Sequence, residues 1–253
     1  MLPQTPSFRL DGRRALVTGA GRGLGAATAA ALAQAGAQVT LCARSRAEIE
    51  EIAQAIRDEG GIADTLVLDV TDLNQVQADL AERPAFHILV NNAGTNRPKP
   101  FTEVSSDDFD AVMGLNLRAA FFVAQGVARG MMDAGHGGSI IHMSSQMGHV
   151  GGQNRTIYCA SKAGIEGLSK AMAIDLAPHN IRVNTIGPTF IETPMTKPFL
   201  ADPVFQSAVL SKIKLGRLGR VEDVMGAVVF LASDAAALIT GAAILVDGGW
   251  TAD

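Results

Sequence analysis

The octapeptide "TGAGRGLG", residues 18–25, decides how this chain folds. It overlaps the end of the apolar run "RALVTGA" (residues 14–20), which predicts a buried strand. It leads into an alanine-rich helical stretch over about residues 24–35. A glycine-rich turn that joins a strand to a helix is the context that a phosphate-binding turn requires. We therefore expect a strand–helix unit that binds a dinucleotide, although an ordinary glycine-rich turn has the same composition.

Each glycine of this turn has a separate use. Gly19 permits the sharp turn, Gly23 lets the backbone approach a pyrophosphate, and Gly25 allows the helix to pack closely. The N-terminus of the following helix offers free N–H groups and a partial positive charge to phosphates. The turn thus predicts where the pyrophosphate of a dinucleotide binds.

The rest of the chain repeats this alternation of short apolar runs and longer helical patterns. The runs are apolar throughout, which is typical of parallel strands covered by helices on both faces. The length suits one large domain over residues 1–253. We expect an α/β fold of the Rossmann type, doubly wound, with a seven-stranded and mostly parallel sheet. Further strands are expected at residues 38–44, 64–70, 86–94, 138–145, 181–188 and 241–249, and further helices at 46–60, 107–134, 158–176 and 221–232.

Composition and charge argue against several other classes of protein. The 21 basic and 25 acidic residues give a net charge of −4, which provides no electrostatic footprint for nucleic acid or an anionic membrane. Cys42 and Cys159 lie far apart in apolar surroundings, so no disulfide framework is expected. The N-terminal stretch lacks the pattern of a secretion signal, and no apolar run reaches the roughly 18 residues of a membrane span. We expect a cytoplasmic protein.

The end of the second strand indicates which dinucleotide binds. A carboxylate there would accept hydrogen bonds from the adenosine ribose and would repel a 2′-phosphate. Instead the chain has Ala43 followed by Arg44 and Ser45, and Arg22 lies in the glycine turn. Two guanidiniums and a hydroxyl suit a 2′-phosphate, so NADP(H) is favoured over NAD(H). The alternative is that Arg44 and Arg46 are surface charges at the start of a helix.

The segment "IYCASKAG", residues 157–164, places the only tyrosine of the chain, Tyr158, four residues before Lys162. Residues at i and i+4 share one helix face, with Cβ atoms about 5–6 Å apart. A tyrosine has an ordinary pKa of about 10, and a nearby ammonium is expected to lower it. The pair can then give a proton to a carbonyl oxygen or take one from an alcohol. Alone, this spacing is common and usually structural.

Three other features support a chemical role for this pair. Ser145 stands thirteen residues before Tyr158 at the end of a strand, where its hydroxyl can bond a reacting oxygen, and Ser144 is the competing candidate. Asn116 lies within a long helical pattern, although asparagine is a mediocre helix former. The segment "NNAG", residues 91–94, follows the fourth strand, and its small residues permit close approach to a cofactor ribose.

Taken in order, these features resemble the short-chain dehydrogenase/reductase family. The resemblance covers about residues 10–250 and includes "TGAGRGLG", "NNAG", Asn116, Ser145 with "YCASK", "IRVNTIGP" and the terminal "VDGG". It is a resemblance to the single-domain branch, whose members have about the length of this chain. It implies an NAD(P)-dependent carbonyl reductase or alcohol dehydrogenase that usually forms a homotetramer. One departure is Thr189 after Pro188, where the family usually has glycine.

The resemblance also implies roles for individual residues. Tyr158 is the acid/base, Ser145 binds the reacting oxygen, and Asn116 relays protons through a water on its backbone carbonyl in a locally disturbed helix. Lys162 tunes Tyr158 and hydrogen-bonds the nicotinamide ribose. The implied dinucleotide contacts, with Asp69 and Val70 at the adenine, are Gly19, Gly21, Arg22, Gly23, Leu24, Gly25, Arg44, Ser45, Asp69, Val70, Asn92, Ala93, Gly94, Tyr158, Lys162, Pro188, Ile191 and Thr193.

Two segments are expected to enclose the substrate. Residues 189–220 break the strand–helix rhythm with three prolines and several apolar side chains, which suits a mobile lid over the nicotinamide. The loop that follows Ser145 forms the opposite wall and favours a hydroxylated or acidic substrate, although a solvated loop is an equally good interpretation. No second ligand stands at a useful spacing from His149, so no metal site is expected. The polar residues of this loop are Gln146, His149, Gln153, Asn154 and Arg155.

These observations give one main hypothesis and two alternatives. The main hypothesis is an oxidoreductase that interconverts a secondary alcohol and a ketone on a small sugar acid, polyol or keto acid. The first alternative is a 3-oxoacyl-thioester reductase acting with acyl carrier protein, for which Arg118, Arg129 and Lys170 are weak candidates for a basic docking patch. The second alternative is a protein that senses the dinucleotide without catalysis.

Overall fold

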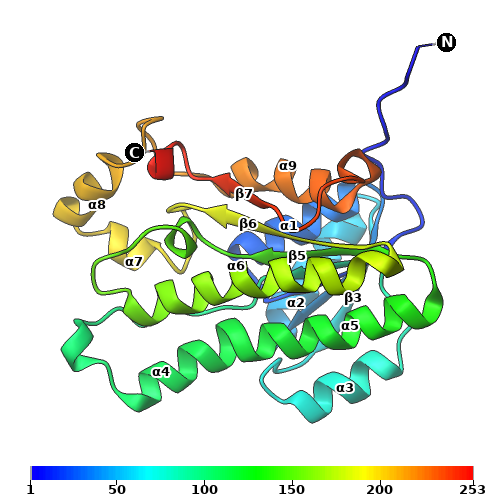
Figure 1. The fold of residues 1–253 in the computed structure, drawn as a ribbon, viewed down its shortest axis with the longest axis horizontal. Coiled ribbons are helices and arrows are strands. Elements are labelled where there is room, and N and C mark those ends of the chain that lie inside the picture. The colour runs from blue at the N-terminus through cyan, green and yellow to red at the C-terminus, as the bar shows by residue number, and fades with distance from the viewer. Residues whose placement is uncertain (1, 253) are drawn as a thin grey trace.

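The computed structural model of the protein describes residues 2–252 and is built around a seven-stranded sheet (Figure 1). The strands lie in the order β3-β2-β1-β4-β5-β6-β7, and every neighbouring pair is parallel. This confirms the predicted doubly wound α/β fold. The strands are β1 (Arg14–Thr18), β2 (Gln38–Ala43), β3 (Ile62–Val67), β4 (Ile88–Asn91), β5 (Gly138–Met143), β6 (Ile181–Pro188) and β7 (Ala243–Val246).

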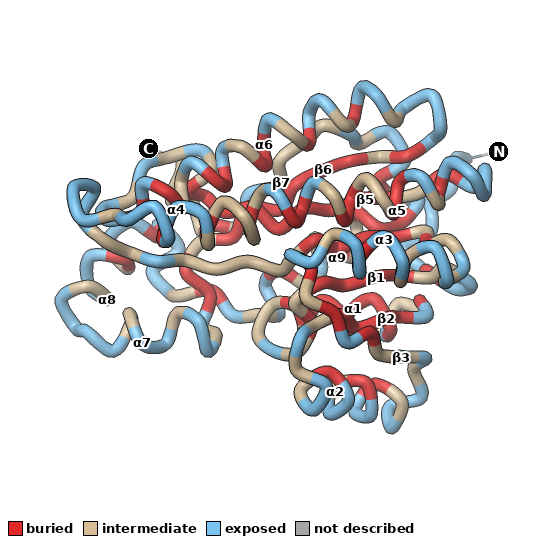
Figure 2. The backbone as a smooth tube through the Cα atoms, turned by 90° about the horizontal axis from the view of Figure 1, so that it is seen from below, coloured by how far each residue is buried: buried red, intermediate tan, exposed pale blue. Residues whose placement is uncertain are grey.

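Helices cover both faces of the sheet and bury two separate apolar layers. One layer packs α1 (Gly23–Gln34), α2 (Arg46–Asp58) and α9 (Val221–Ala232) against the strands. The other layer packs α3 (Leu73–Ala81), α5 (Ala120–Ala134) and α6 (Thr156–Leu176) against the opposite face. Figure 2 shows the consequence, since the buried segments gather along the strands and the outer sides of the helices are exposed.

The order of the strands determines where a ligand can bind. The chain runs outward from β1 through β2 to β3 and then returns to the other side of β1 to form β4. Between β1 and β4 the loops that follow the two strands therefore turn to opposite sides of the sheet. A crevice at this reversal, beyond the carboxyl ends of the strands, is where open parallel sheets bind ligands.

Outside residues 189–220, the structure departs from the expected helices in two places. Helix α3 was not expected, because only Val76 of its residues is buried and its apolar pattern is correspondingly weak. The long helix expected over residues 107–134 is divided into α4 (Ser106–Met113) and α5 by a π-helical turn, Gly114–Ala119. Turns of this kind are rare and are frequently found at functional sites.

The stretch Ser106–Ala134 is long enough to cross a membrane and contains an 18-residue window with a mean hydropathy of 1.4. In this fold, however, it lies beside α3 and α6 and buries one face against the sheet. A core helix passes the same test of length and composition, and the packing accounts for its apolar character.

Residues 189–220 form a separate lobe at one end of the molecule, at the left of Figure 1. They contain the short helices α7 (Lys197–Leu200) and α8 (Pro203–Leu210). Phe190 stacks on Trp250 with ring centroids 5.7 Å apart and meets Phe205 edge-on at 5.6 Å. Tyr158 packs against the same apolar cluster, so the lobe borders the predicted catalytic tyrosine.

Candidate active site

The glycine turn between β1 and α1 has the geometry that its sequence predicts. Gly19 and Gly23 adopt positive φ angles of 63° and 56°, which side chains disfavour. A Cβ atom on Gly25 would lie 2.1 Å from the carbonyl oxygen of Gly19, so this position cannot hold a side chain without moving the backbone. The turn is therefore shaped as a cradle that fits the pyrophosphate of a dinucleotide.

The segment after β4 braces this cradle. The Thr18 hydroxyl accepts hydrogen bonds from the backbone N–H groups of Asn92 and Ala93, both at 3.0 Å. The Asn92 amide donates to the carbonyl oxygens of Thr18 and Gly19 at 3.0 and 3.2 Å. Asn91 ties β4 to the other layer by donating to the carbonyl of Ala120 at 2.7 Å. The two loops that meet at the strand reversal are thus held as one unit.

The residues predicted to bind the adenosine half of the cofactor include two arginines, and each of them lies near a carboxylate. Ser45 is the N-cap of α2 and accepts from the N–H of Glu48 at 3.4 Å. Arg22 lies 3.6 Å from Glu48, and Arg44 lies 3.8 Å from Asp69. The side chains of Arg22 and Arg44 are 72% and 80% exposed, and exposed ion pairs of this length are weak. Both guanidiniums are therefore free to turn toward an added phosphate.

Asp69 and Val70 follow β3 and lie at this same edge. Asp69 accepts from the N–H and the hydroxyl of Thr71 at 2.9 and 2.7 Å, and these bonds outweigh partial burial and lower the pKa of its carboxyl. Val70 is buried in the apolar layer beneath. The pair is consequently rigid, with one carboxylate oxygen still facing Arg44.

Tyr158 and Lys162 lie on one face of α6, as their spacing predicts. The Lys162 ammonium is 5.6 Å from the centroid of the Tyr158 ring and donates to the Met143 carbonyl at 2.8 Å. A Cβ atom on Gly94 would lie 3.8 Å from Nζ of Lys162 and 3.3 Å from Oδ1 of Asn116. The absence of a side chain at Gly94 leaves a space that both polar groups border, which fits a cofactor ribose.

Asn116 lies in the π-helical turn and connects it to α6. Its Oδ1 accepts from the N–H of Thr95 at 2.8 Å, and its Nδ2 donates to the Thr95 carbonyl at 2.9 Å and to the Ser161 hydroxyl at 3.0 Å. The Ser161 hydroxyl in turn donates to the backbone carbonyl of Tyr158 at 2.8 Å. The locally disturbed helix expected at Asn116 is therefore present.

The structure also distinguishes Ser145 from Ser144. The Ser145 hydroxyl donates to Gln146 at 2.7 Å, accepts from the N–H of Met147 at 3.1 Å, and interacts with the phenol of Tyr158. Ser144 is buried, and its hydroxyl has no hydrogen-bond partner among the described residues. Ser145 is thus the serine that faces the tyrosine.

The acid–base properties of the pair differ from the expectation. Burial raises the pKa of the Tyr158 phenol, and the nearby Ser145 hydroxyl offsets only part of that rise. The pKa of the phenol therefore lies above its ordinary value and not below it as expected, because the effect of burial outweighs the effects that favour the phenolate. Burial also lowers the pKa of Lys162 to about 8, although the nearby Glu166 opposes this shift.

The predicted contacts of the nicotinamide end lie where β6 leaves the sheet. Pro188 is the last residue of β6, and Ile191 is buried and pairs with Gly219 across the lobe. Thr193 lies against the glycine turn, since a Cβ atom on Gly23 would be 3.4 Å from that of Thr193. The lobe therefore reaches over the dinucleotide cradle.

The polar residues of the loop after β5 lie in different surroundings, because some are buried and others are exposed. Gln146 is buried beside Ser145, whereas Nε2 of His149 lies 3.3 Å from the buried carboxylate of Glu166. Gln153 and Asn154 are exposed. Glu166 was not singled out in the sequence, because its contacts come from residues far away in the chain. The Thr185 hydroxyl on β6 donates a hydrogen bond to the second carboxylate oxygen of Glu166 at 2.8 Å.

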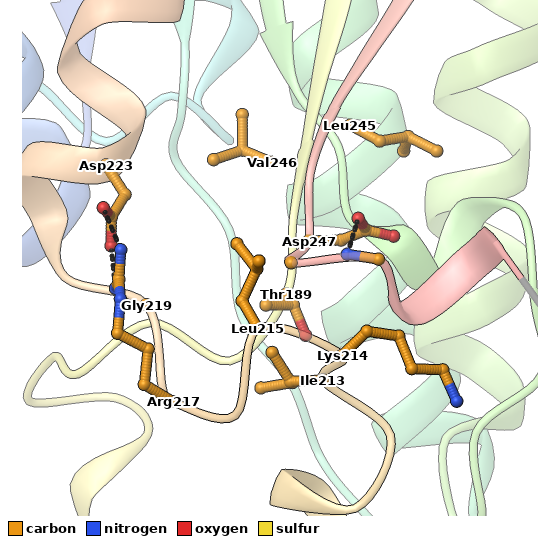
Figure 3. Close-up of a pocket in the computed structure, with 12 residues that line it drawn as sticks. Thr189, Ile213, Lys214, Leu215, Arg217, Gly219, Asp223, Leu245, Val246 and Asp247 are labelled. Carbon is orange, nitrogen blue, oxygen red and sulfur yellow. Dashed lines mark hydrogen bonds and ion pairs between the residues drawn. The ribbon is translucent and has the colours of Figure 1, made fainter.

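A pocket of about 480 Å³ lies apart from these residues (Figure 3). It is enclosed by β7 with the turn after it, by residues 213–219 of the lobe and by the start of α9. The Arg217–Asp223 ion pair, with a closest N···O distance of 2.6 Å, lies at its edge. None of the predicted catalytic side chains lines it, so we do not assign the reaction to this pocket.

Comparisons with known proteins agree with this site. A family model described as enoyl-(acyl carrier protein) reductase matches residues 19–251. The chain is 40% identical to a D-erythrulose reductase of Gallus gallus over 97% of this chain and 98% of that protein. It is also 40% identical to a 3-oxoacyl-[acyl-carrier-protein] reductase of Thermotoga maritima, over 96% of this chain and 99% of the other.

A solved structure is also similar to this chain over almost its full length. It is a gluconate 5-dehydrogenase from Burkholderia cenocepacia in complex with NADP and tartrate, with a TM-score of 0.94, 39% identity and coverage of 97% of this chain and 98% of that one. Fold, motif order and similarity extend over almost the entire chain. The protein is a member of the short-chain dehydrogenase/reductase family.

Proposed function

We propose that the protein is an NAD(P)-dependent oxidoreductase that interconverts a ketone and a secondary alcohol on a small polyol or sugar acid. One observation carries this proposal: Ser145, Tyr158 and Lys162 converge beside the dinucleotide cradle, and Asn116 is joined to Tyr158 through Ser161. Proton transfer by a positioned phenol requires this kind of arrangement.

The residues then have separate tasks. Ser145 holds the carbonyl oxygen, and Tyr158 donates its proton to that oxygen in reduction or accepts one in oxidation. Lys162 hydrogen-bonds the cofactor ribose and favours the phenolate once charge develops. Asn116 holds the π-helical turn whose freed backbone carbonyl binds the relay water. The nicotinamide, when bound, supplies or accepts the hydride.

The cofactor is proposed to be NADP(H), with NAD(H) as the alternative. Arg22 and Arg44 lie at the ribose end with only weak carboxylate partners, and Ser45 begins a helix whose N-terminus favours negative charge. The gluconate 5-dehydrogenase of similar structure was solved with NADP. These features together favour a cofactor that carries a 2′-phosphate.

The substrate is proposed to be small and polar, with the lobe of residues 189–220 as its lid. The names of the relatives include reduction of erythrulose and dehydrogenation of gluconate, which are a ketose and a sugar acid. Gln146 and Gln153 of the loop after β5 supply polar groups, and His149 and Asn154 remain proposed contacts. The apolar cluster of Met147, Phe190 and Tyr158 limits the size of the site.

A 3-oxoacyl-thioester reductase is the second candidate. The Thermotoga relative favours it, since it is named a 3-oxoacyl-[acyl-carrier-protein] reductase, whereas the family model names a reductase of enoyl groups on acyl carrier protein. Arg118 is committed in part to a cation–π contact with Phe122, at 5.5 Å from the ring centroid. A purely dinucleotide-sensing protein is disfavoured because the four predicted catalytic residues are all present.

We further propose a cytoplasmic homotetramer. A groove of about 610 Å³ runs over α4, the π-helical turn and α5, and it is lined by Met113, Leu117 and Phe121 among others. Phe109 and Phe121 are 48% and 40% exposed on this side. An apolar face of this kind is suited to covering by another copy of the chain. Sedimentation of the purified protein measures the assembly directly.

A panel of carbonyl compounds assayed with NADPH and with NADH tests the proposed function. Ketoses, keto-sugar acids and 3-oxoacyl thioesters are followed by loss of the reduced-nicotinamide absorbance. Turnover of the first two classes with little on thioesters is expected. A clear preference for thioesters would favour the second candidate, and no turnover on any carbonyl would favour the sensing protein.

A further inference from the structure

Arg155 is a buried cation beside the proposed catalytic tyrosine. It is the residue that precedes α6, three positions before Tyr158, and only 7% of it is exposed. Its guanidinium lies 5.2 Å from the centroid of the Phe199 ring, which belongs to the lobe of residues 189–220. The side chain thus lies between the start of the catalytic helix and the proposed lid.

This cation has no anionic partner among residues 2–252. Its one hydrogen bond to the protein is a long one, 3.4 Å, to the carbonyl of the adjacent Asn154. The ten ion pairs described include no contact to Arg155. A buried charge without a counter-charge is costly, and buried charges in proteins are normally paired, so a ligand that supplied the missing anion would be stabilised here.

The electrostatic neighbours of Arg155 locate that partner. Tyr158 stands three positions further along the chain, in the first turn of α6, and the Arg155 guanidinium is close enough to lower the pKa of its phenol in part. From the lobe, the facing group is the aromatic ring of Phe199, which attracts a cation but cannot neutralise it. A negative group next to the guanidinium would therefore lie close to the phenol that transfers the proton.

We infer that Arg155 binds a carboxylate of the substrate, so that the preferred substrate is a sugar acid or polyhydroxy keto acid and not a neutral polyol. A guanidinium offers a planar fork of donors that matches the two oxygens of a carboxylate. Phe199 on the lobe covers the pair when the acid is bound. This inference rests on the proposed function, because it names the substrate class of the same site.

The test compares a keto acid with a neutral ketose in matched variants. We would measure reduction of 5-ketogluconate and of erythrulose by the wild type, Arg155→Gln, Arg155→Lys and, as a control, Arg9→Gln, which changes an exposed arginine that has no assigned role in the site. Arg155→Gln should reduce kcat/KM for the keto acid by about 10- to 100-fold, as expected for the loss of a charged hydrogen bond, and should change that for erythrulose by less than about threefold. Arg155→Lys should lose less, because it keeps the charge.

Equal losses on both ketones, or a wild type that prefers the neutral ketose, would overturn the inference. Arg155→Gln should fold at least as well as the wild type, since it removes an unpaired buried charge. If it does not fold, Arg155→Lys decides the question, because wild-type kinetics on the keto acid would contradict a bidentate contact.

A binding measurement separates this inference from the proposed function. Gluconate added with NADPH should raise the melting temperature of the wild type and of Arg9→Gln but not that of Arg155→Gln. This readout needs no turnover, so an absence of activity on every ketone would contradict the proposed function alone. An equal rise in all three proteins would overturn the role of Arg155.

Discussion

Nδ2 of Asn116 donates a hydrogen bond to the Ser161 hydroxyl at 3.0 Å, and this contact joins the π-helical turn to the helix of the catalytic tyrosine. The Ser161 hydroxyl in turn donates a hydrogen bond to the backbone carbonyl of Tyr158. A side chain from a neighbouring helix thereby fixes the start of α6, where a small displacement would move the phenol. The proposed chemistry depends on this placement as much as on the phenol itself.

Replacing Tyr158 with phenylalanine tests the proposed acid. The Tyr158→Phe variant should lose at least ~100-fold in turnover, because a positioned proton donor contributes about 10²–10⁴-fold. Binding of NADPH, followed by its fluorescence, should change little, since Lys162 and the glycine cradle are untouched. Turnover close to that of the wild type would remove Tyr158 from the reaction.

We expect the activity of the enzyme to decline at alkaline pH, as Lys162 loses its positive charge. Burial lowers the pKa of its ammonium to about 8, so the positive charge is present below pH 8 and is lost as the pH rises through that value. Carbonyl reduction and NADPH affinity should therefore both decline above about pH 8. The phenol of Tyr158 has a raised pKa and stays protonated over this range, which suits reduction.

The carboxylate of Glu166 should affect the pH at which this decline occurs. Its carboxylate raises the pKa of Lys162, so Glu166→Gln should move the decline in NADPH affinity to lower pH. Asp175→Asn, an exposed carboxylate on the same helix, is the matched control. His149 faces Glu166 from the loop that carries Ser145, and Thr185 faces it from β6. An unchanged pH for this decline in a folded Glu166→Gln protein would show that this carboxylate does not act on Lys162.

The choice of cofactor is tested at Arg44. Arg44→Ser should weaken NADPH binding by about tenfold or more, because a hydrogen bond to a charged group contributes about 1.5–3 kcal/mol. NADH binding should stay within about twofold, since NADH has no phosphate at this position. Arg129→Ser on α5 serves as the control. Tighter binding of NADH than of NADPH by the wild type would contradict the proposed preference.

The fold could be predicted from the sequence because its strands are apolar throughout and its turns follow them directly. The observed limits of β6 and α9 coincide with the predicted ranges, since both segments have clear apolar patterns. Helix α3 escaped prediction because it rests mostly on its capping by Asp72 and on one buried valine. Contacts with the rest of the fold therefore stabilise this helix, although its own apolar pattern is weak.

The site could be predicted only as far as its residues stand in local motifs. Ser145, Tyr158 and Lys162 have fixed spacings along the chain, and the structure brings them together. Thr95 and Glu166 were not found, because their roles depend on partners about 20 residues away. The pKa of Tyr158 was predicted in the wrong direction, because spacing alone gives the distance to Lys162 but not the burial of the phenol.

The glycine cradle permits a sharp test of the dinucleotide site. A Cβ atom at Gly25 would meet the carbonyl oxygen of Gly19 at 2.1 Å and the amide of Asn92 at 2.7 Å, so Gly25→Ala must displace the turn. Overpacking of this kind costs about 1–3 kcal/mol, and we expect a lower melting temperature together with weaker NADPH binding.

Gly226→Ala is the matched control for Gly25→Ala. Gly226 is likewise inside a helix, α9, but a Cβ atom there would have nothing within 4 Å. Alanine is a better helix former than glycine by about 0.8–1 kcal/mol, so this variant should be as stable as the wild type or more stable, with unchanged NADPH affinity. If both variants bound NADPH like the wild type, the turn after β1 would not be the pyrophosphate site. If both lost binding equally, the effect would come from the added methyl group in general and not from the shape of the cradle.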